Sequence, residues 1–274
     1  KIKEMHLAFI GCGVMGESMI AGLLRQGIVE ASQITASHPR KSRRTELAER
    51  HGIEVFSNNA EAVKADSIAV ICVKPQRLER VFDDLRGRIH TDQLAISIVA
   101  GATIEKLAGE LGTAKVVRAM PNTPSQIGAG ITAWTCTVAV EETERPYVRE
   151  MLSALGKELF VETENMIDMA TSLSATGPTY IFMVMEALTD AGVHLGFSRD
   201  MAKELVQETM LGSVKFAMES HKHPAELRNM VTSPGGTSAE AIYQMEKGSL
   251  RTVLSKAVYA AYKRAVELGK RSNS

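Results

Sequence analysis

From residue 5 to about residue 120, short apolar runs alternate with longer stretches in which apolar residues recur at helical spacing. The uninterrupted apolar run at residues 68–73 is typical of a strand that helices cover on both faces. The pattern predicts strands at residues 6–10, 34–37, 53–56, 68–73 and 94–99, and helices at residues 14–26, 41–51, 60–65, 76–85 and 103–110. This alternation predicts an α/β fold with a doubly wound parallel sheet of the Rossmann type. Residues 115–118 and 130–135 are expected to extend the sheet.

After about residue 162 the pattern is helical only, so we expect two domains, a Rossmann domain at residues 1–163 and an all-helical domain at residues 164–274. Residues 180–195 are apolar on almost every side of the predicted helix. Such a helix requires burial on every side, and a small helical domain offers limited interior. We therefore expect burial against a second subunit, in a homo-oligomer whose smallest unit is a dimer.

Composition excludes several functional classes. Of the 274 residues, 45% are hydrophobic and 23% are charged, as in soluble globular proteins. The 32 Lys and Arg residues balance the 32 Asp and Glu residues, which predicts neither a nucleic-acid nor a membrane partner. The apolar runs are too short to span a bilayer. No signal-peptide pattern precedes the first glycine loop, and Met5 is a candidate start after an extension at residues 1–4. The three cysteines lack paired or metal-binding spacing. A cytoplasmic protein without a metal is expected.

A glycine-rich loop directly follows the first strand and opens the first helix. Its sequence is Gly11-Cys12-Gly13-Val14-Met15-Gly16. In the GxGxxG fingerprint the first glycine permits a tight turn, the second lets a pyrophosphate approach the backbone, and the third permits close helix–strand packing. Gly11, Gly13, Val14, Met15 and Gly16 are therefore predicted to bind a dinucleotide; the alternative is a glycine-rich turn without a ligand.

The end of the second strand indicates which dinucleotide binds. Residues 37–44 contain four cations and two serines, and no acid occurs before Glu46. An acidic residue there would favour NAD, whereas cations and hydroxyl groups suit the 2′-phosphate of NADPH. NADPH is predicted, with NADH possible, and Ser37, His38 and Arg40 are candidate contacts. The alternative is a solvated basic helix start.

Further crevice residues are expected at other strand ends. Val73, Lys74 and Pro75 end the buried strand at residues 68–73, where a parallel sheet binds its ligands, although Lys74 could also be a solvated lysine. Asn59 is a candidate ribose contact and helix N-cap. The two prolines of the segment at residues 118–124 stiffen a polar turn that is suited to the crevice wall near the nicotinamide.

Residues 231–238 form a second candidate anion site. They contain two consecutive glycines and four hydroxyl residues, and they precede a predicted helix at residues 239–246. The unpaired N–H groups at the start of a helix bind small anions, for instance a substrate carboxylate. Because a nucleotide loop already lies near the other end of the chain, this site is expected to belong to the substrate of a two-substrate enzyme.

These motifs resemble those of pyrroline-5-carboxylate reductases over essentially the whole chain. The similarity runs through the glycine loop, Val73-Lys74-Pro75, the Met-Pro-Asn-Thr-Pro core of residues 118–124, residues 173–180, and residues 223–227 with 232–238. The resemblance implies a Rossmann domain, a helical dimerisation domain, NAD(P)H as hydride donor, and a substrate site at the subunit interface. Dimers of that family can assemble into rings, so a homodimer or a decamer is expected.

The resemblance also implies roles for individual residues. In that family the Ser-Pro-Gly-Gly loop holds the substrate carboxylate, and a hydroxyl at the position of Ser238 hydrogen-bonds the ring nitrogen. We therefore expect Ser238 to be catalytic, the backbone N–H groups of Gly236 and Thr237 to hold the carboxylate, and Thr176 and Asn122 to contact the substrate. The chain departs from the family pattern in two places, with Ala175 in place of a glycine and serine in place of threonine at Ser238.

The expected reaction is the NADPH-dependent reduction of L-pyrroline-5-carboxylate to L-proline, the last step of proline biosynthesis. One alternative is a reductase of a related cyclic imine. Another is an enzyme like the β-hydroxyacid dehydrogenases, which needs a lysine on the helix where residues 180–195 contain none. A third is a non-catalytic dinucleotide-sensing protein, which would not need a second anion site.

Overall fold

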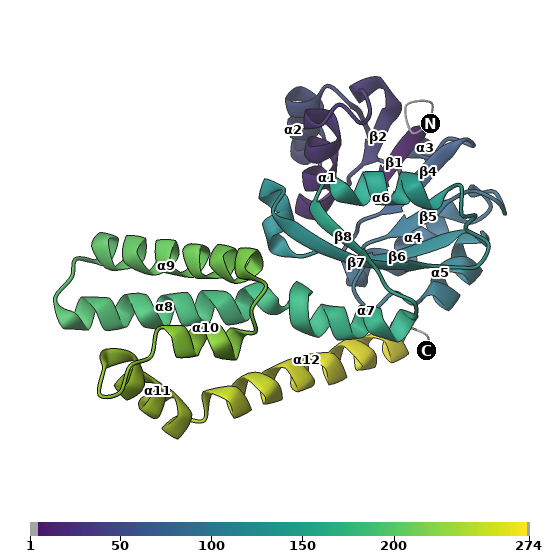
Figure 1. Ribbon diagram of the computed structural model, residues 1–274. Coiled ribbons are helices and arrows are strands. Elements are labelled where there is room, and N and C mark those ends of the chain that lie inside the picture. The colour runs from purple at the N-terminus through teal and green to yellow at the C-terminus, as the bar shows by residue number, and fades with distance from the viewer. Residues whose placement is uncertain (1–4, 273–274) are drawn as a thin grey trace. The chain divides into compact units, whose positions relative to one another are not determined.

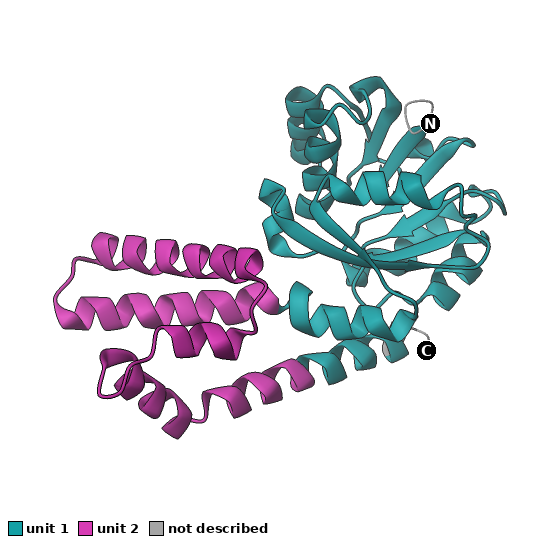
Figure 2. Ribbon diagram, in the orientation of Figure 1, with its two compact units in different colours: residues 1–176, 261–274 teal, residues 177–260 magenta. Residues whose placement is uncertain are grey.

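A computed structural model of the protein describes residues 5–272 (Figure 1). The chain forms two compact units, one made of residues 1–176 and 261–274 and the other of residues 177–260 (Figure 2). The candidate extension at residues 1–4 lies outside the described residues. Among the described residues, no helix combines the length and the apolar character that crossing a membrane requires.

The first unit is built on one eight-stranded sheet with the strand order β3-β2-β1-β4-β5-β6-β7-β8. The strands are β1 (His6–Ile10), β2 (Ile34–Ser37), β3 (Glu54–Phe56), β4 (Ser67–Ile71), β5 (Ala95–Ser97), β6 (Val116–Met120), β7 (Gly130–Cys136) and β8 (Gly156–Phe160). Strands β1 to β6 pair in parallel, which confirms the doubly wound fold predicted from the sequence.

Helices cover both faces of this sheet, because the residues of β1 point alternately to two separate cores. Leu7 and Phe9 join one core, and Ala8 and Ile10 join the other. The helices of this region are α1 (Val14–Arg25), η2 (Ala31–Gln33), α2 (Lys41–His51), α3 (Asn59–Ala62), η3 (Pro75–Arg77), α4 (Leu78–Leu85), α5 (Ile104–Leu111), η4 (Thr123–Ile127) and α6 (Arg145–Ser153). Burial of β4 on both faces explains its continuous apolar run.

The end of the sheet differs from the expectation of a purely parallel sheet. Strand β7 runs antiparallel to β6, because the nine-residue connection at residues 121–129 is too short for the crossover between parallel strands. Helix α6 then returns the chain to β8, which pairs in parallel with β7. The sequence pattern did not reveal β8, whose residues are only half-buried or exposed.

Helix α7 (Glu164–Ala170) packs against β6 and β7, so it belongs to the first unit. Arg118 on β6 is almost fully buried and lies 2.8 Å from a carboxylate oxygen of both Glu164 and Asp168. Glu164 also accepts the backbone N–H of Ile104 at 2.7 Å. The compact unit therefore continues past the expected boundary at residue 163, through the π-helix η5 (Thr171–Ala175), to Thr176.

The second unit contains helices alone within its described residues. They are α8 (Gly177–Leu195), α9 (Arg199–Ser220), α10 (Pro224–Met230), α11 (Thr237–Lys247) and the first part of α12 (Leu250–Ser272). Helices α8 and α9 pack closely where Gly192 meets Ala202, since a Cβ on Gly192 would lie 2.9 Å from the Ala202 Cβ. Several apolar side chains of α8 are exposed, including Phe182 and Met183.

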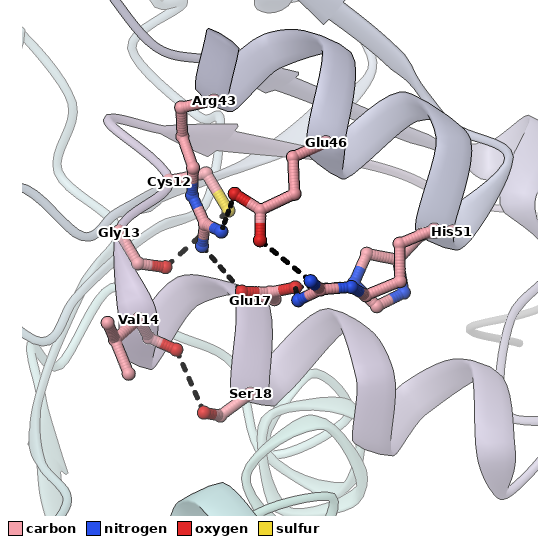
Figure 3. Close-up of polar contacts among 9 residues, drawn as sticks. Cys12, Gly13, Val14, Glu17, Ser18, Arg43, Glu46 and His51 are labelled. Carbon is pink, nitrogen blue, oxygen red and sulfur yellow. Dashed lines mark hydrogen bonds and ion pairs between the residues drawn. The ribbon is translucent and has the colours of Figure 1, made fainter. Parts of the chain in front are cut away.

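Helices α1 and α2 of the first unit are joined by an ionic cluster around Glu17 (Figure 3). The largely buried Glu17 carboxylate binds the guanidinium groups of Arg43 and Arg50 and accepts a hydrogen bond from His51 at 2.9 Å. Glu46 pairs with the same two arginines at 2.8 and 2.7 Å. Burial alone would raise the pKa of Glu17, but the hydrogen bonds from His51, Arg43 and Arg50 outweigh it and lower this pKa to about 2.

The pKa of Glu17 predicts acid sensitivity. Because the folded-state pKa of about 2 is below the ordinary value of 4.5, the carboxylate stabilises the fold above pH 4.5, and this contribution is lost as the pH falls towards 2. We expect Glu17→Gln to lower the free energy of unfolding at pH 7 by roughly 1–3 kcal/mol. Urea denaturation at several pH values between 7 and 2 measures this loss, which should shrink below pH 4.5.

Glu49→Gln is the matched control, because Glu49 is exposed on α2 and has no ion pair within the described residues. It should change the free energy of unfolding by less than about 0.5 kcal/mol. A loss in Glu17→Gln that stays constant down to pH 2 would contradict the assigned pKa.

Candidate active site

The three glycines of the first loop have different surroundings. Gly11 has a φ of +73°, and a Cβ there would lie 1.9 Å from Cγ1 of Val73. A Cβ on Gly16 would lie 2.7 Å from Sγ of Cys72, so the start of α1 packs directly against the end of β4. At Gly13, by contrast, the nearest atom would be the Gly11 carbonyl oxygen at 4.0 Å. The space left open at Gly13, at a helix N-terminus, fits the pyrophosphate of a dinucleotide.

A cleft of about 540 Å³ extends from this loop across the carboxyl ends of β1, β2 and β4; we call it the nucleotide cleft. It is lined by Gly11, Gly13, Val14, His38, Pro39, Arg40, Arg43, Glu46, Ser57, Asn59, Cys72, Val73, Lys74, Arg77, Arg80, Val81 and Asp84. Eight residues predicted to bind the cofactor are among them, namely Gly11, Gly13, Val14, His38, Arg40, Asn59, Val73 and Lys74. The cleft lies where ligands bind in doubly wound sheets.

Four other predicted cofactor residues lie outside this lining. Met15 packs against the core, and Gly16 is buried at the contact with Cys72. Pro75 begins η3 and stiffens the chain next to the cleft. Ser37 is fully buried, since its hydroxyl accepts the N–H of Gly11 at 3.0 Å and donates to Asn59 at 2.7 Å. In this structure it fixes the glycine loop, and the phosphate contact that the sequence suggested stays a prediction.

The sequence suggested Asn59 as the N-cap of α3, but a different residue takes that position. Asn58 is the cap, because its side chain accepts the N–H of Ala60 at 2.8 Å. The Asn59 side chain instead accepts the Ser37 hydroxyl and donates to Asp84 on α4 at 2.9 Å. A chain of hydrogen bonds therefore joins the end of β2 to α4 along one wall of the nucleotide cleft.

The basic segment after β2 contributes less free charge than its sequence suggests. Arg43 is neutralised by Glu17 and Glu46, and Arg44 closes a turn by donating to the backbone carbonyls of residues 38 and 39. Lys41 does not line the cleft, so among the described residues Arg40 is the cation of this segment whose charge stays unpaired there. Burial, followed by the charge of nearby Arg40, lowers the pKa of His38, which leaves this ring neutral at pH 7.

Three polar residues that line the cleft from other elements were missed by the sequence analysis. Arg77, Arg80 and Asp84 line the cleft from η3 and α4. Their spacing of three and four residues places them on one side of a helix, directly after the Val-Lys-Pro strand end. That polar stripe is the signal that could have revealed them.

The two cysteines beside the glycine loop are structural. Cys12 and Cys72 are free and buried. Burial raises the pKa of Cys12 to about 12 and raises the pKa of Cys72 as well. Both thiols are therefore neutral at pH 7 and pack as small apolar groups, as the sequence suggested. No group of three metal-binding side chains occurs in the described part of the chain.

Two predicted substrate contacts have their side chains engaged with the backbone. Asn122 accepts the N–H of Ile131 at 3.0 Å and donates to the carbonyl of Ser174 at 3.1 Å. Thr176 donates its hydroxyl to the carbonyl of Thr171 at 2.8 Å, across the turn that closes η5. The bonds of Asn122 join the π-helix to the turn at η4.

The Ser-Pro-Gly-Gly loop of the second unit precedes α11. Gly235 has a φ of +70°, which favours glycine, and the N–H of Gly236 donates to the carbonyl of Ser233 at 3.0 Å. In this conformation the turn uses the Gly236 N–H, and its expected role in anion binding stays a prediction.

Helix α11 begins at Thr237, two residues earlier than predicted. The N–H groups of Thr237, Ser238 and Ala239 consequently lie at the start of the helix without intrahelical partners. The half-buried Ser238 hydroxyl also has no hydrogen bond among the described residues. The first turn of α11 therefore offers N–H groups and a hydroxyl to an anionic ligand.

Comparison with known families divides the chain in a similar way. Residues 6–101 match a family model described as NADP oxidoreductase, coenzyme F420-dependent. Residues 164–268 match a model described as pyrroline-5-carboxylate reductase dimerisation. The second match contains both the exposed apolar helix α8 and the Ser-Pro-Gly-Gly loop.

Individual proteins match along nearly the whole chain. Pyrroline-5-carboxylate reductase of Pseudomonas aeruginosa is 39% identical over 264 residues, which cover 96% of each protein. The Pisum sativum enzyme is 37% identical over 262 residues, covering 96% of this chain and 95% of that protein. The structure of Plasmodium falciparum pyrroline carboxylate reductase with NADP bound has a TM-score of 0.89 at 31% identity, covering 98% and 100% of the two chains. That of the Coxiella burnetii enzyme has a TM-score of 0.86 at 33% identity, covering 96% and 98%.

The glycine loop and the nucleotide cleft fit the same family as the dimerisation-model match and the full-length similarities. The chain belongs to the pyrroline-5-carboxylate reductase family.

Proposed function

We propose that this protein reduces L-pyrroline-5-carboxylate to L-proline with NADPH, as the last step of proline biosynthesis. The observation that carries the proposal is the first turn of α11, where free N–H groups and the unpartnered Ser238 hydroxyl lie together. Such a turn suits a small carboxylate that has a hydrogen-bonding ring nitrogen nearby. The whole-chain similarity to pyrroline-5-carboxylate reductases supports the same reaction.

In this proposal the protein contributes mainly binding and orientation. The N–H groups of Thr237 and Ser238, together with the dipole of α11, hold the substrate carboxylate. The Ser238 hydroxyl hydrogen-bonds the ring nitrogen, which carries a proton when the imine carbon is reduced. Bound NADPH supplies the hydride. A fixed carboxylate and a fixed nitrogen leave the ring one orientation, so the entropic barrier to reaction falls.

The residues of the first unit fit the cofactor. Gly13 leaves room for the pyrophosphate, and the nearby wall at Val73 and Lys74 lies at the carboxyl end of β4. We further propose a homodimer as the smallest active unit, and a cytoplasmic location. The exposed apolar side chains of α8 and the dimerisation match support assembly with a second copy, on which larger rings of dimers would be built.

A substrate panel tests the reaction. We expect NADPH oxidation with L-pyrroline-5-carboxylate to be at least about tenfold more efficient, as kcat/KM, than with its six-membered homologue. Hydroxyacids should give no turnover in the oxidative direction with NADP. A preference for the six-membered ring would favour a related imine reductase, and activity with a hydroxyacid would favour the dehydrogenase alternative. Tight NADPH binding without turnover of any compound would indicate a sensing protein.

Replacement of Ser238 tests its proposed role. We expect Ser238→Ala to lower kcat by about 10- to 100-fold, because the hydrogen bond to the ring nitrogen is lost, while the Kd for NADPH stays within about twofold. Ser238→Thr keeps the hydroxyl and should retain most of the activity. Steady-state kinetics and calorimetric NADPH titration provide the two measurements. Unchanged turnover in Ser238→Ala would remove this residue from the mechanism.

The loop glycines predict two separable effects. A methyl group at position 13 meets only open space, so Gly13→Ala should leave the melting temperature within about 1 °C while weakening NADPH binding by at least about tenfold. Gly16→Ala places a methyl group 2.7 Å from Cys72 Sγ and should instead lower the melting temperature by several degrees, roughly 1–3 kcal/mol of stability. Thermal melts and NADPH titrations of both variants measure these effects. Equal NADPH affinity in Gly13→Ala and the wild type would contradict the assigned pyrophosphate position.

A further inference from the structure

The nucleotide cleft contains more cations than its own acids balance. Arg40, Arg43, Lys74, Arg77 and Arg80 line it, whereas Glu46 and Asp84 are the acids of the lining. Arg43 is neutralised by its ion pairs with Glu17 and Glu46. The other four cations have no ion pair within residues 5–272, so their charge is available to an anionic ligand.

The position of Arg77 and Arg80 follows from the hydrogen-bond chain along the same wall. Arg77, Arg80 and Asp84 are spaced three and four residues apart and share one side of α4 and of the η3 turn before it. Asp84 is connected through Asn59 to Ser37 at the end of β2, by hydrogen bonds of 2.9 and 2.7 Å. This face of α4 therefore looks towards the end of β2, where a doubly wound fold places the adenosine ribose.

The pyrophosphate does not account for these two arginines. Its site at Gly13 is provided by backbone N–H groups and the dipole at the start of α1. The remaining charge of NADP(H) is the 2′-phosphate on the adenosine ribose, which NAD(H) lacks. A guanidinium group can bind a phosphate through two parallel N–H donors, which gives arginine both affinity and directional specificity.

We propose that Arg77 and Arg80 bind the 2′-phosphate of the cofactor from the α4 side of the cleft, opposite Arg40, and thereby set the preference for NADPH over NADH. This assignment moves the specificity determinant from the basic segment at residues 40–44 to the start of α4. Within that segment, Arg43 and Arg44 already bind the protein's own carboxylates and carbonyls. The proposal rests on NADP use, which the family shares, and is independent of the imine that is reduced.

Calorimetric titration of Arg77→Gln, Arg80→Gln and the double variant tests the proposal without any imine substrate. For each single variant we expect the Kd for NADPH to rise about 10-fold, and for the double variant about 100-fold, because charge-assisted hydrogen bonds are lost. The Kd for NADH should change by less than about threefold. Adenosine 2′,5′-bisphosphate should lose affinity as NADPH does, whereas 5′-AMP should not.

Arg88→Gln is the matched control, because Arg88 is exposed just after α4, lies outside the cleft lining and has no ion pair in the described part of the chain. It should leave both affinities unchanged. Arg77→Lys and Arg80→Lys keep the charge, lose the two parallel donors and should fall between the wild type and the glutamine variants. Thermal melts of all variants establish that each is folded.

Two outcomes would overturn the proposal. An equal loss of NADPH and NADH affinity would place the arginines against the shared adenosine or pyrophosphate. Unchanged NADPH affinity in the double variant would assign the 2′-phosphate to the other unpaired cations, Arg40 and Lys74, and not to these arginines. A protein that binds NADPH as expected and yet fails to reduce L-pyrroline-5-carboxylate would contradict the proposed reaction and leave this inference intact.

Discussion

The contact between the start of α1 and the end of β4 is the constraint on which the nucleotide cleft depends. Gly11 meets Val73 and Gly16 meets Cys72 at distances that no side chain could occupy. This contact brings the free N–H groups of the helix to the carboxyl edge of the sheet. The neutral thiols of Cys12 and Cys72 fill the small space behind the loop, so the helix can approach without burying a charge. Of the three loop glycines, Gly13 alone faces open space, which fits the proposed pyrophosphate.

A second set of polar contacts connects the glycine loop with the adenosine end of the cleft, which lies at the end of β2 and at α4. The buried Ser37 hydroxyl ties the glycine loop to Asn59, and Asn59 ties the end of β2 to α4. Glu17 holds α2 against α1 in the same region. The polar groups in these contacts have their partners within the protein. The cleft residues whose charges have no such partner therefore determine which ligands the cleft can bind.

The sequence predicted most of the Rossmann sheet because each strand from β1 to β5 is a short apolar run between helical patterns. It did not reveal β8, which is half-exposed, or the reversal at β7, which depends on the length of one connection. The glycine loop was predictable, since its chemistry is local. The roles of Ser37, Gly236 and Arg43 were not, because each depends on a partner that only the folded chain supplies.

The three proposed anion sites differ in what they can distinguish. At Gly13 and at the first turn of α11, the donors are mainly backbone N–H groups, which bind any small anion of suitable shape. In the proposed reaction, selectivity at α11 comes from the Ser238 hydroxyl, which can recognise a nitrogen beside the carboxylate. At the proposed 2′-phosphate site the donors are exposed arginine side chains. Under these proposals, substrate choice depends on a helix start, whereas cofactor choice depends on the exposed side chains of Arg77 in η3 and Arg80 in α4 and is the more easily altered of the two.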